Sequence, residues 1–293
     1  MEKILFIGAS GMLGKPVARE LIRAGFELTL FGRDTEKLEK FFPNIHTVQG
    51  DVFNTTSLLH AMKGQDIVYL NLSINQRVGK SGLQPEREGI KNIFLAAKNA
   101  GIKRISYLSS LIKNYRGMNE FRWWAFDVKH AAIDSIKKSG IPYSIFYPST
   151  FMETIDQQML QGNKIIIPGK SEAPMWFIAA KDYGEQVAWA FKKAGDDSFE
   201  YPIQGLEPFT LDEAVRIFIS NYKKPVSLLR VPMLSLKLTG LISNKMNYAA
   251  NICEALNKYP EKFVSEKSWE DLGKPSVRLA DYAASLIIQN PVS

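Results

Sequence analysis

The stretch Gly8-Ala9-Ser10-Gly11-Met12-Leu13-Gly14 decides the fold of this 293-residue chain. It follows the wholly apolar run Ile4–Ile7, which is typical of a strand covered on both faces. It precedes a helical pattern with Pro16 in its first turn. Glycines between a strand and a helix let the backbone approach a diphosphate, to which the helix N-terminus supplies N–H donors. The stretch therefore predicts a dinucleotide-binding turn, and a glycine-rich turn without a ligand is the alternative.

Strands and helical patterns alternate through the first half of the chain. Gly25, Gly101 and Gly140 stand where helices should end. Strands separated by such helices indicate βαβ units with right-handed crossovers, so we predict an α/β fold with a doubly wound, Rossmann-like parallel sheet. After a first helix that ends at Gly25, helices are expected at 35–42, 55–62, 85–100 and 126–138, and strands at 4–7, 27–31, 47–49, 66–70, 104–108 and 143–147.

The rhythm changes after Pro148. The segment 227–258 is less regular, because Pro232 and Gly240 interrupt it. We predict a cofactor-binding domain over 1–150 and a smaller C-terminal α/β lobe over 151–293, with some strands returned to the main sheet. In this lobe the sequence predicts strands at 164–167, 175–178 and 201–204, a helix at 182–193 with Asp182 as its N-cap, and a helix at 210–221 opened by a threonine cap.

Composition excludes several classes of protein. Hydrophobic residues make up 45% of the chain and charged residues 23%, which argues against a disordered or fibrous chain. The net charge of +7 is mild, so we expect no nucleic-acid partner. The single Cys253 excludes an internal disulfide framework, and the three histidines lack metal-ligand spacing, so no metal is expected. No apolar run could span a bilayer and the N-terminal run has no cleavage site, so the expected location is the cytoplasm.

The second expected strand ends in Phe31-Gly32-Arg33-Asp34, which bears on the choice of cofactor. NAD sites usually carry an acid here that accepts hydrogen bonds from the ribose hydroxyls. Arg33 offers instead a guanidinium that can pair with a 2′-phosphate, and Lys37 adds charge one turn later. We therefore predict NADP as the cofactor. Asp34 keeps the alternatives open, because it could accept a ribose hydroxyl or, like Arg33, be a solvated surface charge.

Further short motifs occur in order over about residues 1–220, and with the glycine turn they resemble the NmrA-like family of atypical short-chain dehydrogenases/reductases. The resemblance implies an NAD(P)-binding Rossmann fold. It places Asp51 and Val52 at the adenine, Asn71, Leu72 and Ser73 along the ribose, and Ser109, Lys129, Tyr147 and Pro148 near the cofactor. The motifs are Gly50-Asp51-Val52, Asn71-Leu72-Ser73, Leu108-Ser109-Ser110, Lys129, Pro148–Glu153, Ile178–Gly184 and Gly205–Ala214.

The chain departs from its superfamily at the catalytic motif Tyr-x-x-x-Lys, in which the tyrosine is the general acid/base and the lysine lowers its pKa. Lys129 is present, but Ala125 stands four residues before it. Tyr115 lies 14 residues upstream of Lys129 on an expected loop, and spacing does not place it in the site. Lys129 is thus the catalytic candidate, as acid/base without the tyrosine. The alternatives are that it only anchors the nicotinamide ribose or is a surface lysine.

Two aromatic features are open to more than one interpretation. Tyr147 ends a strand at the sheet edge where ligands bind, so its ring either stacks near the nicotinamide or packs in the core. Four aromatic residues crowd into 119–126, and they line an apolar substrate pocket, form a protein contact or pack in the core. They are Phe121, Trp123, Trp124 and Phe126.

These observations predict an NADP-dependent oxidoreductase that acts on a small, partly apolar carbonyl or enone compound. The alternative is a non-catalytic NADP(H)-binding regulator that senses redox state and binds a partner protein, because the tyrosine is absent. A sugar-nucleotide epimerase is a weaker hypothesis, since that chemistry normally needs the tyrosine. A protein partner or a homo-oligomer is compatible with the sequence.

Overall fold

The centre of the protein is a seven-stranded, wholly parallel sheet in a computed structural model that describes residues 2–286. The strand order is β10-β6-β5-β4-β1-β2-β3, so the chain moves outward from β1 to β3 and then returns to β4 on the other side of β1. This reversal confirms the predicted doubly wound, Rossmann-like sheet. The strands are β1 (Lys3–Ile7), β2 (Glu27–Gly32), β3 (His46–Gln49), β4 (Ile67–Leu70), β5 (Arg104–Leu108), β6 (Tyr143–Pro148) and β10 (Phe199–Ile203).

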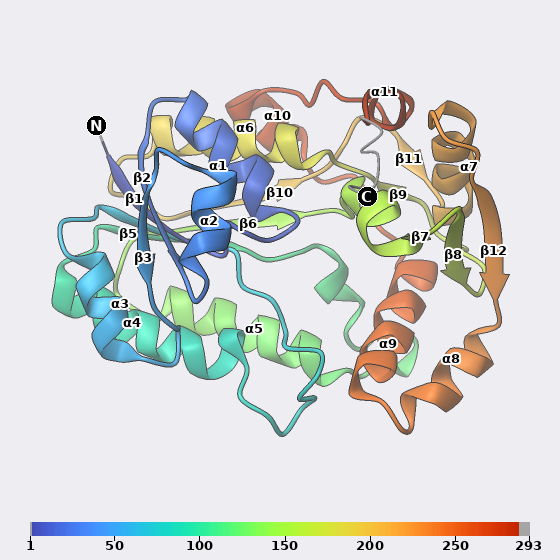
Figure 1. Ribbon diagram of the computed structural model, residues 1–293, viewed down its shortest axis with the longest axis horizontal. Helices are drawn as coiled ribbons and strands as arrows, with labels where there is room; N and C mark the ends of the chain where they lie inside the picture. The colour runs from blue at the N-terminus through green and yellow to red at the C-terminus, as the bar shows by residue number, and fades with distance from the viewer. Residues whose placement is uncertain (1, 287–293) are drawn as a thin grey trace.

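Helices cover both faces of this sheet (Figure 1). The helices α1 (Gly14–Arg23) and α6 (Ala180–Lys193) pack against each other on one face, and α2 (Thr35–Phe41) leads into the edge strand β3. Because both faces are covered, burial extends along the central strands; every residue of β4 and β5 is buried, and most of them are apolar. The other face carries α3 (Thr55–Met62), α4 (Ile90–Ala100) and α5 (Trp124–Lys137).

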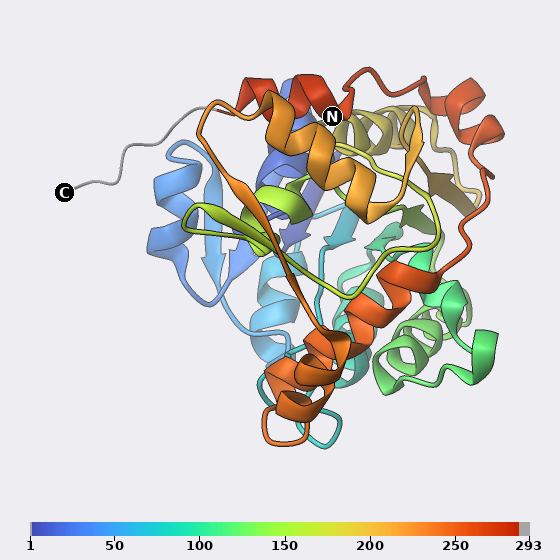
Figure 2. The same cartoon turned by 90° about the vertical axis from the view of Figure 1, so that its right-hand side faces the viewer.

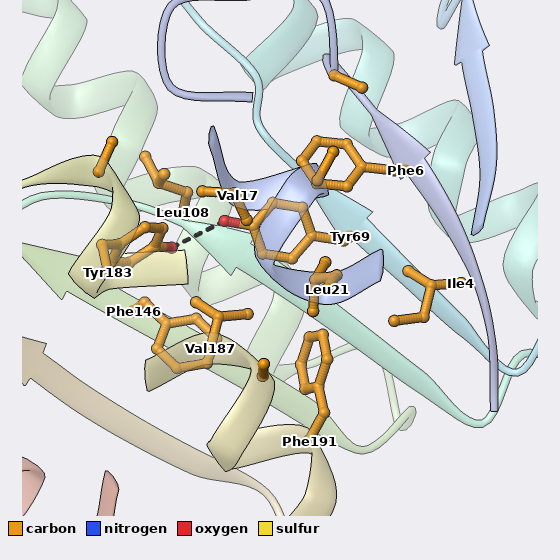
Figure 3. Packing of buried hydrophobic residues seen from close by; sticks show 14 of the residues in the cluster. Ile4, Phe6, Val17, Leu21, Tyr69, Leu108, Phe146, Tyr183, Val187 and Phe191 are labelled. Atoms are coloured by element: carbon orange, nitrogen blue, oxygen red, sulfur yellow. Dashed lines mark hydrogen bonds between the residues drawn. The ribbon is translucent and has the colours of Figure 1, made fainter. Parts of the chain in front are cut away.

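The core between the sheet and the pair α1 and α6 contains a buried contact between two tyrosine hydroxyls. Figure 3 shows Tyr69 of β4 and Tyr183 of α6 pointing toward each other, with their hydroxyl oxygens 2.9 Å apart. Burial raises the pKa of both phenols, so they stay neutral and satisfy each other in an apolar surrounding. The contact joins the strand that borders the predicted cofactor site to a helix from the second half of the chain.

Most of the rest of the chain forms smaller units on the right of Figure 1. Figure 2 looks onto them, with α8 and α9 below the small three-stranded sheet. That sheet has the order β12-β8-β7, and a second, two-stranded sheet pairs β11 with β9. The strands are β7 (Leu160–Gln161), β8 (Lys164–Pro168), β9 (Met175–Trp176), β11 (Pro208–Phe209) and β12 (Ser227–Val231); the helices are α7 (Leu211–Asn221), α8 (Met233–Gly240), α9 (Asn244–Lys258), α10 (Glu266–Leu272) and α11 (Leu279–Ser285).

The prediction that Asp182 is a helix N-cap is wrong. The helix α6 begins at Ala180, and the Asp182 carboxylate accepts hydrogen bonds from the backbone N–H groups of Ser276 and Val277, at 3.0 and 2.9 Å. The free N–H of Ala180 donates instead to the carboxylate of Glu153, at 2.9 Å. Both partners lie far away in the sequence, so the local pattern around Asp182 could not reveal them.

Other boundaries also differ from the prediction. Only Met175–Trp176 of the strand expected at 175–178 pairs as a strand, because β11 offers two partners, while Ile178 makes an isolated bridge to Phe151. The helix expected at 85–100 starts with a π-helical turn over Pro85–Gly89. The segment 227–258 is more regular than expected, since Ser243 caps the 15-residue helix α9 by accepting a hydrogen bond from the Met246 N–H.

Candidate cofactor and active site

A groove of about 770 Å³ lies where the carboxyl ends of β1, β2, β3 and β4 meet. This is the edge at which open parallel sheets bind ligands. The structure brings eight of the predicted cofactor residues together in its wall, although they come from four separate stretches of the sequence. They are Gly8, Ser10, Arg33, Asp51, Val52, Asn71, Leu72 and Ser73.

The structure requires glycine at positions 8 and 14 of the turn after β1 for different reasons. Gly8 has a φ of +95°, and a Cβ atom there would overlap the backbone carbonyl of Asn71. A Cβ atom at Gly14 would overlap the carbonyl oxygen of Gly8, so Gly14 permits α1 to pack closely on the end of β1. The N–H of Gly11 donates to the Gly8 oxygen at 3.2 Å, which closes the turn. Side chains at Gly8 and Gly14 would fill this turn, so the glycines keep it open, as a turn that takes up a diphosphate requires.

The charges around the groove favour an anionic ligand. Arg33 is exposed at its wall and forms no ion pair with any residue of 2–286. Asp34 is occupied elsewhere, because its carboxylate caps α2 by accepting a hydrogen bond from the Lys37 N–H at 2.9 Å. The acid that kept a ribose contact open in the sequence therefore has a structural role.

Two cations in the groove wall were missed by the sequence analysis. Arg77 comes from the segment that follows β4, and Lys245 from the first turn of α9. The Asn244 side chain donates to the Arg77 carbonyl at 3.1 Å and so ties the two segments together. No motif marked either residue, since their proximity depends on the fold of the C-terminal segment over the groove.

Ser109 and Pro148 lie beside the groove rather than in its wall. They sit at the ends of the neighbouring strands β5 and β6: the Ser109 N–H donates to the Phe146 carbonyl, and the Leu111 N–H to the Pro148 carbonyl, both at 2.9 Å. The Ser109 hydroxyl is buried and has no hydrogen-bond partner among the described residues. Met12 contacts the C-terminal part of the chain, where its sulfur accepts from the Gln158 amide at 3.5 Å.

Lys129 lies on α5 and is also outside the groove wall. Its ammonium forms an ion pair with the carboxylate of Glu86 at 2.8 Å, and 17% of its side chain is exposed. Ala125, at the position of the usual tyrosine, is buried in an aromatic cluster. Tyr115 is buried in the same cluster, with its ring centroid 4.8 Å from that of Phe121. Among these residues, Lys129 is therefore the one with a reactive group near solvent.

Tyr147 contacts charged groups on both its ring and its hydroxyl. The ring is covered on one side by the Lys113 ammonium, 4.6 Å from the ring centroid, and the hydroxyl donates to Glu200 at 2.5 Å. Burial lowers the pKa of Lys113 to about 8. Burial and the neighbouring carboxylate of Glu200 raise the pKa of Tyr147, so this phenol is a poor substitute for a general base.

Core packing accounts for most of the aromatic run at 119–126. Phe121, Trp123 and Phe126 are buried together, with ring centroids 4.9 to 5.9 Å apart. Trp124 is half-buried and faces a separate hollow of about 400 Å³ that Leu241 and Tyr248 also line. Three of the four aromatic residues therefore pack in the core, and Trp124 is the member of the run that lines a hollow.

Within residues 2–286, no group of three or more histidine, cysteine, aspartate or glutamate side chains could hold a metal ion. None of the helices in the described part of the chain is both long and apolar enough to cross a membrane.

Comparison with known proteins identifies the family. Residues 8–174, more than half of the chain, match the model of the NAD(P)H-binding family. The chain therefore belongs to that family. The matched range contains every residue of the groove wall except Ile7 and Lys245, and the glycine turn leaves room for the diphosphate of such a cofactor.

Curated relatives are similar over different lengths. The chain is 32% identical to a 2-alkyl-3-oxoalkanoate reductase of Shewanella oneidensis over 39% of its own length, but this covers only 30% of that reductase. It is 24% identical to eugenol synthase 2 of Clarkia breweri, over 79% of this chain and 78% of that protein. It is 20% identical to the photosystem II assembly factor Ycf39 of a Synechocystis strain, over 87% of this chain and 78% of that protein.

Solved structures share the fold along nearly the whole chain. The triphenylmethane reductase of a Citrobacter species, solved with NADP(H), has a TM-score of 0.73 and 19% identity, covering 96% of this chain and 99% of that one. The NADPH-dependent quinone oxidoreductase of Escherichia coli has a TM-score of 0.70 and 19% identity, covering 96% and 98%.

Proposed function

We propose that the protein is an NADP-dependent oxidoreductase that reduces a small, partly apolar carbonyl or enone compound. The observation that carries this proposal is the groove itself, with the glycine turn at the end of β1 and, at the end of β2, the Arg33 guanidinium, which forms no ion pair within residues 2–286. Relatives named as reductases support the reaction class.

The chain's own residues would bind the cofactor as follows. Backbone N–H groups of the turn Gly8–Gly14 would hold the diphosphate, Arg33 the 2′-phosphate, and Asp51 and Val52 the adenine. Asn71, Leu72 and Ser73 would line the ribose. Arg77 and Lys245 add positive charge to the same wall, which supports NADP over NAD. The bound cofactor supplies the hydride, and the protein supplies its orientation and electrostatics.

Lys129 is the residue we propose for proton delivery to the substrate. It lies on α5 one helical turn after Ala125, which stands at the position of the usual tyrosine. An ammonium can donate a proton or stabilise a developing oxyanion. Ser109 and Pro148, at the ends of the two strands nearest to α5, would border the reacting ring.

A direct test uses NADPH deuterated at C4, with each face labelled in turn. The protein is incubated with a small-molecule extract beside Lys129→Ala, and deuterated products are sought by mass spectrometry. A labelled product that appears only with the unaltered protein supports the reductase and identifies its substrate class. No label, with NADPH binding demonstrated in parallel, would remove the proposal.

The second candidate is a non-catalytic, redox-responsive binding protein. It is favoured by Ala125 in place of the tyrosine, by the ion pair that holds Lys129, and by the similarity to a protein named as an assembly factor. It requires a partner protein that prefers either NADPH-bound or NADP⁺-bound protein. Immobilised protein loaded with each form in turn would distinguish the two candidates.

Several finer expectations stay predictions: the NmrA-like subgroup, the division of the chain near residue 150, the cytoplasmic location, and a protein partner or homo-oligomer. The edge strand β10 bears on the division, because it comes from beyond residue 150 and pairs in parallel with β6.

A further inference from the structure

A buried carboxylate of no assigned role stands next to Lys129. The side chain of Glu86 is 0% exposed. Its Oε1 atom accepts two hydrogen bonds, one from the Lys129 ammonium at 2.8 Å and one from the Tyr107 hydroxyl at 2.7 Å. The carboxylate and burial raise the pKa of Tyr107 well above its ordinary value, so this phenol remains a donor to Glu86.

Glu86 is also joined to the cofactor groove by the chain itself. The preceding residue, Pro85, lines the groove. The residue before that, Gln84, is wholly buried and fixes the groove-side segment: its side chain donates to the Gly79 carbonyl at 2.6 Å and accepts from the Asn75 N–H at 2.7 Å. The position of Glu86 is therefore set by the same segment that forms the wall of the groove.

Glu86 differs from the buried acids that only hold the fold together. In Glu153, Asp182 and Glu261, both carboxylate oxygens accept hydrogen bonds. In Glu86, Oε2 is buried and has no hydrogen-bond partner within residues 2–286. A buried carboxylate with one oxygen unused is costly for the fold, and such groups concentrate where function requires them.

We propose that Glu86 is a positioning residue that fixes the ammonium of Lys129 at the edge of the cofactor groove. This inference rests on the proposed function, in which Lys129 delivers the proton. A lysine has a flexible four-carbon stem, and a second group must hold its ammonium at one place. Glu86 does this from a rigid, buried point, with Tyr107 fixing the same oxygen from the other side.

The test is trace acetylation of lysines at fixed pH, with the modified peptides quantified by mass spectrometry. In the unaltered protein, Lys129 should react several-fold more slowly than Lys138, which is exposed at the end of the same helix. In Glu86→Gln, which keeps the shape of the side chain and an acceptor for Tyr107, acetylation of Lys129 should rise several-fold. Equal rates for Lys129 and Lys138 in the unaltered protein would overturn the inference, even if Glu86→Gln did not fold.

Asp66→Asn is the matched control. Asp66 pairs with Lys103 at the same 2.8 Å, on the surface and away from the groove. The Asp66→Asn substitution should raise the acetylation of Lys103 and leave the acetylation of Lys129 unchanged. A rise at Lys129 in this variant would show that the signal reports general loosening, and the inference would fail.

Turnover provides the functional arm once the isotope experiment has identified a substrate. Glu86→Gln should lower kcat roughly tenfold to a hundredfold, as displacement of a reacting group by about 1 Å does, with little change in KM for NADPH. If acetylation changes but kcat does not, Glu86 holds Lys129 without serving the reaction, and the inference is overturned. If no protein variant transfers hydride, the proposed function fails, while acetylation still decides whether Glu86 fixes Lys129.

Discussion

The two halves of the molecule hold their shape by different means. In the first half, short buried strands pair in parallel, and the sheet satisfies the backbone groups of its strands. In the second half, buried polar side chains bond to the backbone of distant segments. Glu261, for example, accepts from the Ser149 hydroxyl, the Gln204 amide and the Trp176 N–H.

Gln204 extends this network on the C-terminal side. Its amide also donates to the Lys262 carbonyl at 2.9 Å, and its oxygen accepts from the Val264 N–H at 2.7 Å. The irregular segments of this half satisfy part of their buried backbone through such side chains. The comparison teaches that the sheet of the first half depends mainly on glycines and apolar patterns, whereas the irregular segments of the second half also need individual buried acids and amides.

Gly14→Val should have the largest effect, because it forces side-chain atoms into the backbone of Gly8 and Ala9. The backbone cannot move aside as a side chain can. We therefore expect the free energy of unfolding to fall by more than the cost of ordinary overpacking, which is about 1–3 kcal/mol. NADPH binding should be lost as well. Gly11→Val is the matched variant: its Cβ would lie 3.3 Å from the Gly8 oxygen, a tight but tolerable contact. It should lose NADPH binding and keep its melting temperature. Equal melting temperatures for both variants would contradict this account of the turn.

Glu261→Ala tests the other half. It removes the acceptor of the Ser149 hydroxyl and the Trp176 N–H, while the Gln204 amide keeps the Lys262 carbonyl; each buried donor left unpaired costs about 1–3 kcal/mol. We expect a clear fall in denaturant midpoint, whereas NADPH affinity measured on the folded protein should change little. Glu261→Gln, which keeps one acceptor, should lose less. A Glu261→Ala variant as stable as the unaltered protein would show that the network is not what holds this half.

Arg33→Ala should act on binding alone. The loss of a charge-assisted contact to the 2′-phosphate should cost about 1.5–3 kcal/mol of NADPH affinity. That corresponds to a factor between about ten and somewhat over a hundred in Kd. NADH affinity should be unaffected, and Lys40→Ala, which removes an exposed cation of α2 outside the groove wall, should affect neither cofactor. Fluorescence titration measures the affinity for both cofactors. If Arg33→Ala weakened the binding of NADPH and NADH equally, a contact of Arg33 with the 2′-phosphate would be excluded.

Glu153 gives the smallest effect, and it depends on pH. Burial raises the pKa of this carboxyl to about 7 from an ordinary value near 4.5. Between these two values the native protein binds more protons than the unfolded chain, so stability falls as pH rises. The Glu153→Gln variant has no carboxyl at this position and therefore does not lose stability in this way. Between about pH 4.5 and pH 7, its free energy of unfolding should rise relative to that of the unaltered protein, by at most about 1.4 kcal/mol per pH unit. Parallel urea titrations at several pH values measure the difference, and a constant difference would contradict the assignment.

The first half of the fold and much of the groove could be predicted from the sequence. The glycine turn, the alternation of strands and helices, and Arg33 are local patterns with a direct physical meaning. The ion pair between Lys129 and Glu86 could not be predicted, because the two residues are 43 positions apart and Glu86 carries no motif. The same holds for Arg77 and Lys245, which meet in the groove only because α9 packs on the segment after β4.

The sequence by itself determined a parallel α/β sheet with a dinucleotide turn, because hydrophobic period and glycine positions act over a few residues. The tertiary structure alone decided which buried acids hold the second half, that Asp182 binds the segment 276–277 rather than its own helix, and that Lys129 is held by Glu86. The physical reason is that burial and hydrogen-bond partners of a charged side chain depend on chain segments brought together by folding.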